Sequence, residues 1–249
     1  MNKLVTTTLF ILVVLSSCTH YYYVANVQNV PLFKEKNEFR FSGTYGFGDY
    51  SSCAEVQTAY SITNSIGIMA NYMSAKGGKA SDNSNYGRGG YFDGAIGYYK
   101  PILEHGVFEI YGGVGGSNQH HQYSSGFYNY YAGTSSLSFT KLFVQPSFGF
   151  TFNGIDIAAS TRICSLSFHQ IENQIDRQYA QADYDKLNNI SKKSYFFLEP
   201  AITFRGGWKY VKLQLQAAFT NGLNKGDLSF AEPEHISLGL YIAFAGRYK

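Results

Sequence analysis

The sequence predicts an all-β protein: an antiparallel up-and-down transmembrane β-barrel, with ten strands as the preferred count. Three observations lead to this prediction. Stretches of the chain alternate apolar residues with small or polar ones at a period of two, which is the period of a β-strand. Short and long connections follow one another between these stretches. Charged residues make up only 15% and aromatic residues 17% of the 249 residues, a composition typical of a barrel wall with aromatic girdles.

The alternation is clearest in the last stretch, whose apolar residues share one face: Leu238, Leu240, Ile242 and Phe244. Small or polar residues fill the other face, as in a wall with lipid outside and a polar lumen inside. In order, the predicted strands cover residues 39–45, 55–62, 66–73, 92–99, 108–114, 141–148, 155–163, 196–205, 211–219 and 237–244. Eight strands remain if the first pair belongs to a tether, and twelve result if residues 169–193 contain a hairpin.

Each of the other strands is assigned from the apolar residues that alternate along it. In chain order, these outward residues are Phe39, Phe41 and Tyr45; Val56, Tyr60 and Ile62; Ile66, Ile68 and Tyr72; Phe92, Ile96 and Tyr98; Phe108, Ile110 and Val114; Leu142, Val144 and Phe148; Ile155, Ile157 and Ile163; Phe196, Leu198, Ile202 and Phe204; Val211, Leu213, Leu215 and Phe219. No charged residue falls on these faces, where one at mid-membrane depth costs about 2–4 kcal/mol.

The connections separate the two ends of the barrel. Short ones are predicted at residues 63–65, 101–105, 151–154 and 206–208, and long ones at 76–88, 117–135, 169–193 and 221–234. The first connection at the end with the long loops, near residues 49–52, is the one exception, because it is short. Short periplasmic turns and long outer loops are the asymmetry of bacterial outer-membrane barrels, and this arrangement places both chain termini in the periplasm.

The charges within the strands fall on the inward faces and balance. The predicted lumen charge network contains Arg40, Glu55, Asp93, Glu109, Lys141, Asp156, Arg162, Glu199, Arg205 and Lys212. Equal numbers of cations and anions favour ion pairs that fill the lumen, whereas a selective pore shows one dominant sign more often. Asp156 with Arg205, and Arg162 with Glu199, are candidate pairs on neighbouring strands. A conduction path or a ligand site is the alternative reading.

The N-terminus has the pattern of a secretory signal. A short cationic start precedes an apolar core from Leu4 to Leu15, which is too short to cross a bilayer. We therefore predict a signal peptide over residues 1–17, an N-terminal periplasmic tether over 18–36 and the barrel over 37–249. The stretch Leu15-Ser16-Ser17-Cys18 resembles a bacterial lipobox, and this resemblance implies cleavage before Cys18 and its acylation. The residues after Cys18 lack the acidic cluster of a surface-export tag, which favours an anchor in the periplasmic leaflet of the outer membrane.

The last strand also carries a resemblance. Its pattern of polar, glycine, apolar and aromatic positions resembles the closing-strand signal of outer-membrane β-barrels, which the barrel-assembly machinery reads; the matching residues are Ser237, Gly239, Ile242 and Phe244. The chain after Cys18 thus resembles the small bacterial outer-membrane β-barrels, lipidated Bacteroidota types among them. No functional subfamily is identified by these motifs.

Motifs for catalysis and cofactors are weak. Barrel-type lipid esterases need a serine and a histidine on the wall, and no histidine falls within a predicted strand. His120 and His121 are expected in a loop, so no metal site and no cofactor are predicted. The net charge of +3 and the lack of a basic run argue against nucleic acid. Cys53 and Cys164 fall half a barrel apart, too far for a disulfide, so both are predicted to be free thiols.

These observations predict a non-enzymatic, lipid-anchored barrel in the outer membrane with a largely filled lumen. Its expected role is that of a structural, adhesive or complex-forming component. Outer-membrane lipids surround it, and loops 117–135 and 169–193 are the candidate sites for a protein partner. The alternative is a narrow pore for ions or small solutes, and a barrel-embedded lipid-modifying enzyme comes third. A soluble β-sandwich lipoprotein remains a fourth reading.

Overall fold

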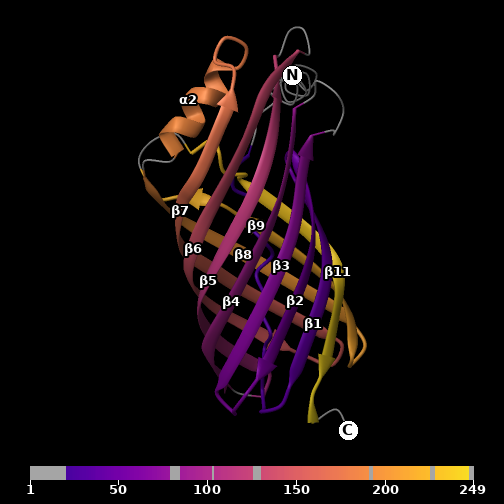
Figure 1. Ribbon diagram of the computed structural model, residues 1–249. Helices are drawn as coiled ribbons and strands as arrows, with labels where there is room; N and C mark the ends of the chain where they lie inside the picture. Colours follow the sequence, from indigo (N-terminus) through magenta and orange to yellow (C-terminus); the bar gives the residue numbers. More distant parts are fainter. Residues whose placement is uncertain are drawn as a thin grey trace, which may run out of the picture.

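The computed structural model describes residues 21–78, 85–102, 104–125, 130–190, 193–224 and 228–246. The chain forms a closed antiparallel barrel of ten strands, which confirms the predicted fold and strand count (Figure 1). The strands are β1 (Phe39–Gly48), β2 (Ser51–Ser61), β3 (Ile66–Gly78), β4 (Tyr86–Ile102), β5 (Gly106–Ser124), β6 (Tyr131–Thr151), β7 (Ile155–Ile175), β8 (Ser194–Gly207), β9 (Val211–Phe219) and β11 (Glu234–Phe244). A two-residue strand, β10 (Asn221–Gly222), pairs with β8, and one helix, α2 (Gln181–Ile190), follows β7.

The barrel closes where its first and last strands meet. β1 pairs with β11 from Phe39 opposite Phe244 to Gly48 opposite His235. The other long strands pair with their neighbours in the chain. β9 pairs with β8 and, past the two-residue β10, with β11. Pairing around the full circumference leaves no open edge, the requirement for backbone inside a bilayer.

The wall separates an apolar outside from a polar inside. Large apolar side chains face outward along every long strand and stay exposed, as Leu238, Ile202 and Phe92 illustrate. The alternate positions point inward and are buried, including charged and amide side chains. This alternation is the pattern of a barrel wall in contact with lipid. Among the described residues, no helix is long and apolar enough to span a membrane.

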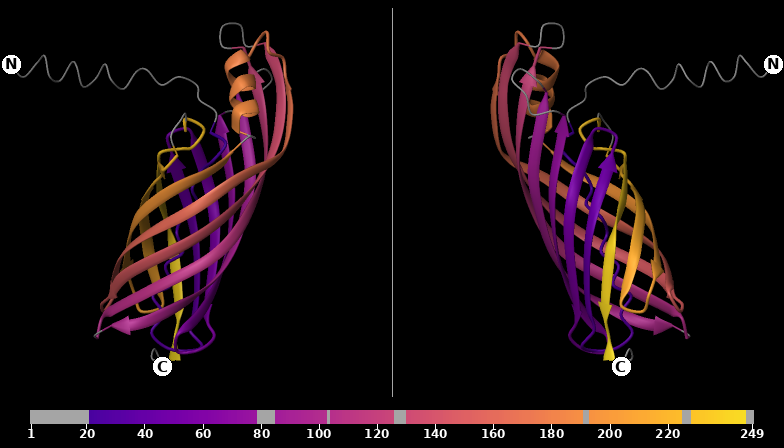
Figure 2. Two further views of the ribbon diagram at one scale, coloured as in Figure 1. Left: turned by 90° about the vertical axis from the view of Figure 1, so that its left-hand side faces the viewer. Right: turned by 90° about the vertical axis from the view of Figure 1, so that its right-hand side faces the viewer.

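The two ends of the barrel differ, as Figure 2 shows. At one end the strands join through tight turns such as residues 62–65 and 152–154. β5, β6 and β7 are 19, 21 and 21 residues long, and at the other end they rise above their shorter neighbours, with α2 packed against the extension. We call this second end the long-loop end and the first the short-turn end.

Two predicted loops are wrong in part. Most of residues 117–135 continues β5 and β6 around a short connection, and residues 169–175 continue β7 before α2 begins. The hairpin considered for 169–193 is absent from the described residues there. Above the membrane a strand has no lipid-facing side, so polar residues occupy both faces and the alternation that reveals a strand disappears.

The segment before β1 does not lie outside the barrel, and the predicted tether is wrong for its described part. Residues 21–36, which we call the lumen segment, run through the barrel interior as irregular chain. The Tyr21 hydroxyl donates to Asp49 at the long-loop end, and the Lys36 N–H donates to Asn64 in a turn at the short-turn end. The segment therefore crosses the whole lumen.

This path also corrects the expected position of the N-terminus. Tyr21 lies at the long-loop end, whereas β11 finishes at the short-turn end beside the start of β1 (Figure 1). The two ends of the described chain are thus on opposite sides of the barrel, not on the same side. Cys18 and the predicted signal peptide lie outside the described residues.

Candidate functional site in the lumen

The backbone of the lumen segment is hydrogen-bonded to side chains of the barrel wall. An irregular chain away from water must find partners for its N–H and C=O groups outside itself. Every carbonyl from Val27 to Pro31 accepts a hydrogen bond from a wall side chain. The donors are Gln57 to Val27 (2.7 Å), Gln216 to Gln28 (2.9 Å), Gln145 to Asn29 (2.8 Å), Arg205 to Val30 (2.8 Å), and Arg40 (3.1 Å) and Tyr241 (2.8 Å) to Pro31.

Backbone N–H groups of the segment reach wall acceptors as well. The Val27 N–H lies 3.0 Å from both carboxylate oxygens of Glu55, and the Phe33 N–H donates to Glu109 at 3.1 Å. Hydrogen bonds to charged groups contribute about 1.5–3 kcal/mol each, more than bonds between neutral groups. The long polar side chains of the wall therefore replace the water that would otherwise solvate this segment.

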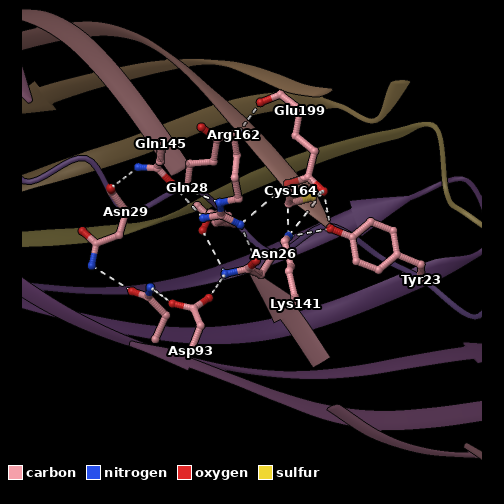
Figure 3. A network of polar contacts seen from close by, with 12 residues as sticks. Tyr23, Asn26, Gln28, Asn29, Asp93, Lys141, Gln145, Arg162, Cys164 and Glu199 are labelled. Carbon is pink, nitrogen blue, oxygen red and sulfur yellow. Dashed lines mark hydrogen bonds and ion pairs between the residues drawn. The ribbon is translucent and has the colours of Figure 1, made fainter. Parts of the chain in front are cut away.

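The strongest charge cluster surrounds Glu199 (Figure 3). Lys141 Nζ lies 3.1 Å and Arg162 Nη1 3.7 Å from Glu199 Oε2, and all three side chains are buried. Tyr23 of the lumen segment joins them: its hydroxyl donates to Glu199 and accepts from Lys141 Nζ at 2.5 Å. The predicted pairing of Arg162 with Glu199 is therefore present, with Lys141 as an additional cation.

A chain of amides links this cluster to Asp93. Arg162 Nη1 donates to the Asn26 oxygen at 2.6 Å, and the Asn26 amide donates to Asp93 at 3.0 Å. Asn71 donates to the other Asp93 oxygen and accepts from Asn29 at 2.8 Å. Asparagine donates and accepts at once, so the lumen segment connects cations and anions that do not touch.

The other charged residues of the predicted network are also buried, but they pair differently from expectation. Lys212 Nζ lies 2.6 Å from Asp156, so Asp156 pairs with Lys212 and not with Arg205. Arg205 faces Asp156 across β7 and β8, yet it turns to the lumen segment and stacks 3.7 Å from the Tyr241 ring centroid. Arg40 pairs with Glu38, just before β1. Arg205 therefore hydrogen-bonds to the lumen segment, although it was expected to pair with Asp156 on the neighbouring strand.

Aromatic side chains close the lumen at the long-loop end. Phe230 packs edge-on against Tyr195, with ring centroids 4.6 Å apart, and against Phe168 at 5.6 Å. Its carbonyl accepts from the N–H groups of Tyr22 and Tyr23. Buried Leu187 and Ile190 of α2 belong to the same cluster. Below it lies the polar network, so the lumen segment is clamped by aromatic packing above and by hydrogen bonds below.

A carboxylate outside the spanning strands fixes the rim. Glu232 accepts from the Tyr50 and Ser51 N–H groups at 3.1 and 3.2 Å, and from the Ser51 hydroxyl at 2.6 Å. Burial is the largest influence and raises the pKa of Glu232 above its usual value, although these hydrogen bonds act in the opposite direction. The same loop meets the lumen segment, because the Glu232 N–H donates to the Tyr23 carbonyl.

A separate cluster lies on the opposite wall. Cys53 Sγ is 3.3 Å from His235 Nε2 and 3.4 Å from Glu55 Oε1, and all three residues are buried. The expectation that no histidine lies in a strand is wrong, since β11 includes His235. It also fails for His120 and His121, which lie in β5 and not in a loop, and for His169 in β7. Cys53 and Cys164 are both free thiols, as predicted, and both are buried.

The sequence carries a signal for the lumen segment that is separate from the apolar alternation of the strands. Residues 19–33 contain no lysine, arginine, aspartate or glutamate, although a tether in water would be rich in charge. Asn26, Gln28 and Asn29 stand close together in the sequence, and the inward faces of the wall contain uncharged glutamines such as Gln57 and Gln216. Uncharged amides on both sides indicate two surfaces that hydrogen-bond to each other.

Comparisons with known proteins agree on the architecture. No protein-family model and no curated protein matches the sequence. Among solved structures, the translocator domain of the autotransporter NalP from Neisseria meningitidis matches with a TM-score of 0.52 and 10% identity, over 84% of this chain and 88% of that one. The outer-membrane protease OmpT from Escherichia coli matches with a TM-score of 0.43 and 11% identity, over 88% of this chain and 99% of that one. The NalP match and the closed ten-stranded sheet show that the chain has the fold of outer-membrane β-barrels. The predicted lack of enzymatic activity stays a prediction.

Proposed function

We propose that this protein is an outer-membrane barrel closed by its own N-terminal segment, which acts as a structural, adhesive or complex-forming component and not as a pore. One observation carries the proposal: residues of the lumen segment from Tyr22 to Phe33 are largely buried and bonded to the wall along the lumen. A pore needs a solvated path, whereas here protein amides and side chains occupy the places of water.

The closure is strong enough to last. A hydrogen bond to a charged group contributes about 1.5–3 kcal/mol, and an unsatisfied buried polar group costs about 1–3 kcal/mol. Withdrawal of the lumen segment would remove hydrogen bonds from three buried carboxylates at once, those of Glu199, Asp93 and Glu55. The segment is therefore a fixed part of the barrel and not a gate.

The long-loop end is the surface on which such a barrel would meet a partner. Long connections of outer-membrane barrels lie outside the cell, so we assign the extension of β5–β7 and α2 to the outer face. It contains much of the two predicted partner regions, 117–135 and 169–193. The closing strand, with Ser237, Gly239, Ile242 and Phe244, lies beside β1, and its recognition by the barrel-assembly machinery remains part of the proposal.

The path of the lumen segment changes where a lipid anchor would sit. Tyr21 lies at the long-loop end, and three residues of extended chain span at most about 11 Å. An acylated Cys18 would therefore lie near the outer face, in contrast to the periplasmic leaflet expected from the missing export tag. Mass spectrometry of the N-terminal peptide tests the acylation, and a tag inserted after His20 tests its side in intact cells.

Single-channel conductance tests the closed lumen. The purified protein is refolded, shown by heat-modifiable gel mobility to be a barrel, and placed in planar bilayers. We expect no steady channels from the native protein. A variant in which residues 22–33 are replaced by a glycine-serine chain of equal length should conduct, because it keeps the connection to β1 and removes the partners of the wall.

Conductance of the native barrel would contradict the proposal. Steady native channels whose ion selectivity changes when Lys141 is neutralised would establish the narrow pore instead. The matched control replaces exposed residues of the same chain, Tyr179 and Trp208, by serine, and should leave the bilayer silent.

A further inference from the structure

We propose that Cys53, Glu55 and His235 form a binding site for one divalent transition metal ion, with zinc as the best match. The three residues lie on the inner wall near the long-loop end, and one ligand atom from each falls within 4.8 Å of the others. Two wall strands, β2 and β11, supply every ligand, and one of these ligands, Glu55, also accepts from the Val27 N–H of the lumen segment.

The strand geometry explains why the three side chains meet. Cys53 and Glu55 are two apart on β2, so both point inward. His235 is on β11, which is separated from β2 by β1. On β1 the position between them is Gly46, directly opposite Cys53. A Cβ at Gly46 would collide with His235 Nε2 and lie 2.9 Å from Cys53 Sγ, so the absent side chain creates the space in which the histidine ring reaches the thiol.

The distances match those between ligands of one metal ion. Zinc binds sulfur at about 2.3 Å and nitrogen at about 2.0–2.1 Å, and tetrahedral angles then place the two atoms about 3.5 Å apart. The Cys53 sulfur lies 3.3 Å from His235 Nε2 and 3.4 Å from Glu55 Oε1. Small side-chain shifts are sufficient to bring all three atoms around one centre.

The donor set selects the class of metal. A thiolate, an imidazole and a carboxylate suit zinc and related transition ions, whereas magnesium and calcium prefer oxygen alone. Thiolate and carboxylate together carry two negative charges, which balance a divalent cation in a buried place. Among the described residues, the Glu55 carboxylate contacts the Val27 N–H and the Cys53 thiol, and no cation is in direct contact with it. Three protein ligands leave the fourth position for water.

A cysteine nucleophile is the competing explanation, and the geometry disfavours it. A catalytic cysteine needs a histidine whose far nitrogen is oriented by a third group. His235 Nδ1 is buried and has no hydrogen-bond partner within the described structure, and the carboxylate contacts the thiol instead of the imidazole. Cys53 is only 1% exposed, which leaves no room for a substrate. A small ion has a short way in, since β1 ends two residues beyond Gly46.

Metal titration of the folded, reduced and chelator-treated protein tests the site. Zinc alone should bind at one ion per chain, and cobalt(II) should produce the charge-transfer absorption of a cobalt–thiolate bond. Both signals should disappear in Cys53→Ser and weaken at least tenfold in His235→Gln and Glu55→Gln. Cys164→Ser is the matched control, because Cys164 is also buried beside a glutamate but has no histidine, and it should keep both signals.

Other results would overturn the proposal. These are zinc binding that survives in Cys53→Ser, a cobalt–thiolate band that disappears in Cys164→Ser, or no zinc bound to native protein with its thiols titrated as reduced. If Cys53→Ser fails to fold by the gel-mobility assay, the double variant Cys18→Ser/Cys164→Ser decides, because Cys53 is then its one thiol and the cobalt–thiolate band must still be present.

Discussion

Two buried glutamates on the inner wall each lie beside a cysteine thiol, but only one of the two also contacts buried cations. Glu199 lies 3.5 Å from the thiol of Cys164, and Glu55 lies 3.4 Å from the thiol of Cys53. Glu199 is also bound by Lys141 and Arg162, whereas Glu55 receives only the thiol and the Val27 N–H among the contacts described.

The difference shows how the barrel uses its lumen. Around Glu199 the protein supplies its own cations, so the charge is compensated when the chain folds and the cluster can hold Tyr23 in place. Around Glu55 the direct contacts are neutral donors, the Val27 N–H and the Cys53 thiol, so a cation from solution could bind beside the carboxylate. The same residue type therefore serves as a structural anchor on one side of the barrel and as a candidate ligand on the other.

The largest effect is expected when the compensated site is broken. Glu199→Gln should lower the free energy of unfolding by about 3–5 kcal/mol, because Lys141 and Arg162 then remain buried without a counter-charge. Denaturant unfolding in detergent micelles measures this change. Glu55→Gln is the matched control and should cost less than about 1.5 kcal/mol, since a glutamine oxygen can still accept from the Val27 N–H. Equal losses in both variants would refute the comparison.

A medium effect is expected at the contact between the lumen segment and the compensated site. Tyr23→Phe removes the hydroxyl that donates to Glu199 and accepts from Lys141, at a cost of about 1.5–3 kcal/mol because both partners are charged. Urea midpoints of the variant and of Tyr72→Phe, whose ring faces outward, measure the difference. A variant as stable as the control would mean that the wall charges are satisfied without the segment.

The smallest effect concerns a third carboxylate, Glu232, which is held by neutral donors at the rim. Burial raises its pKa, so the protonated acid is favoured in the folded protein. Its contribution to stability is thus complete below the unfolded pKa of about 4.3 and is lost as the pH rises through the folded pKa. Glu232→Gln should remove this pH dependence from the unfolding midpoint. Glu234→Gln, at an exposed neighbour, should retain it.

The sequence was sufficient for the barrel because lipid imposes a strict rule on every spanning strand. Outward positions such as Leu238 and Ile202 must be apolar, and the alternation counts the strands directly. The rule ends at the membrane surface. The upper parts of β5, β6 and β7 therefore have no such pattern, and their polar residues indicated loops instead of strands.

The candidate sites were only partly predictable, for a different reason. The inward charges follow from the same alternation, but their partners depend on what else occupies the lumen. Arg205 contacts Val30 and not Asp156, because the lumen segment offers a carbonyl that no wall pattern reveals. The meeting of Cys53 with His235 depends on the closure of β1 with β11 and on the space above Gly46, which only the folded barrel brings together.

The threaded chain also constrains the order of events during biogenesis. The lumen segment leads directly into β1, and β1 forms the seam with β11, the last strand to be made. Once that seam is paired, bulky residues such as Tyr22 and Phe33 could enter only end-on through a filled ring. We therefore expect the lumen segment to bind to the open sheet before β1 pairs with β11. Pairing of these two strands then encloses the segment, and the wall forms around it.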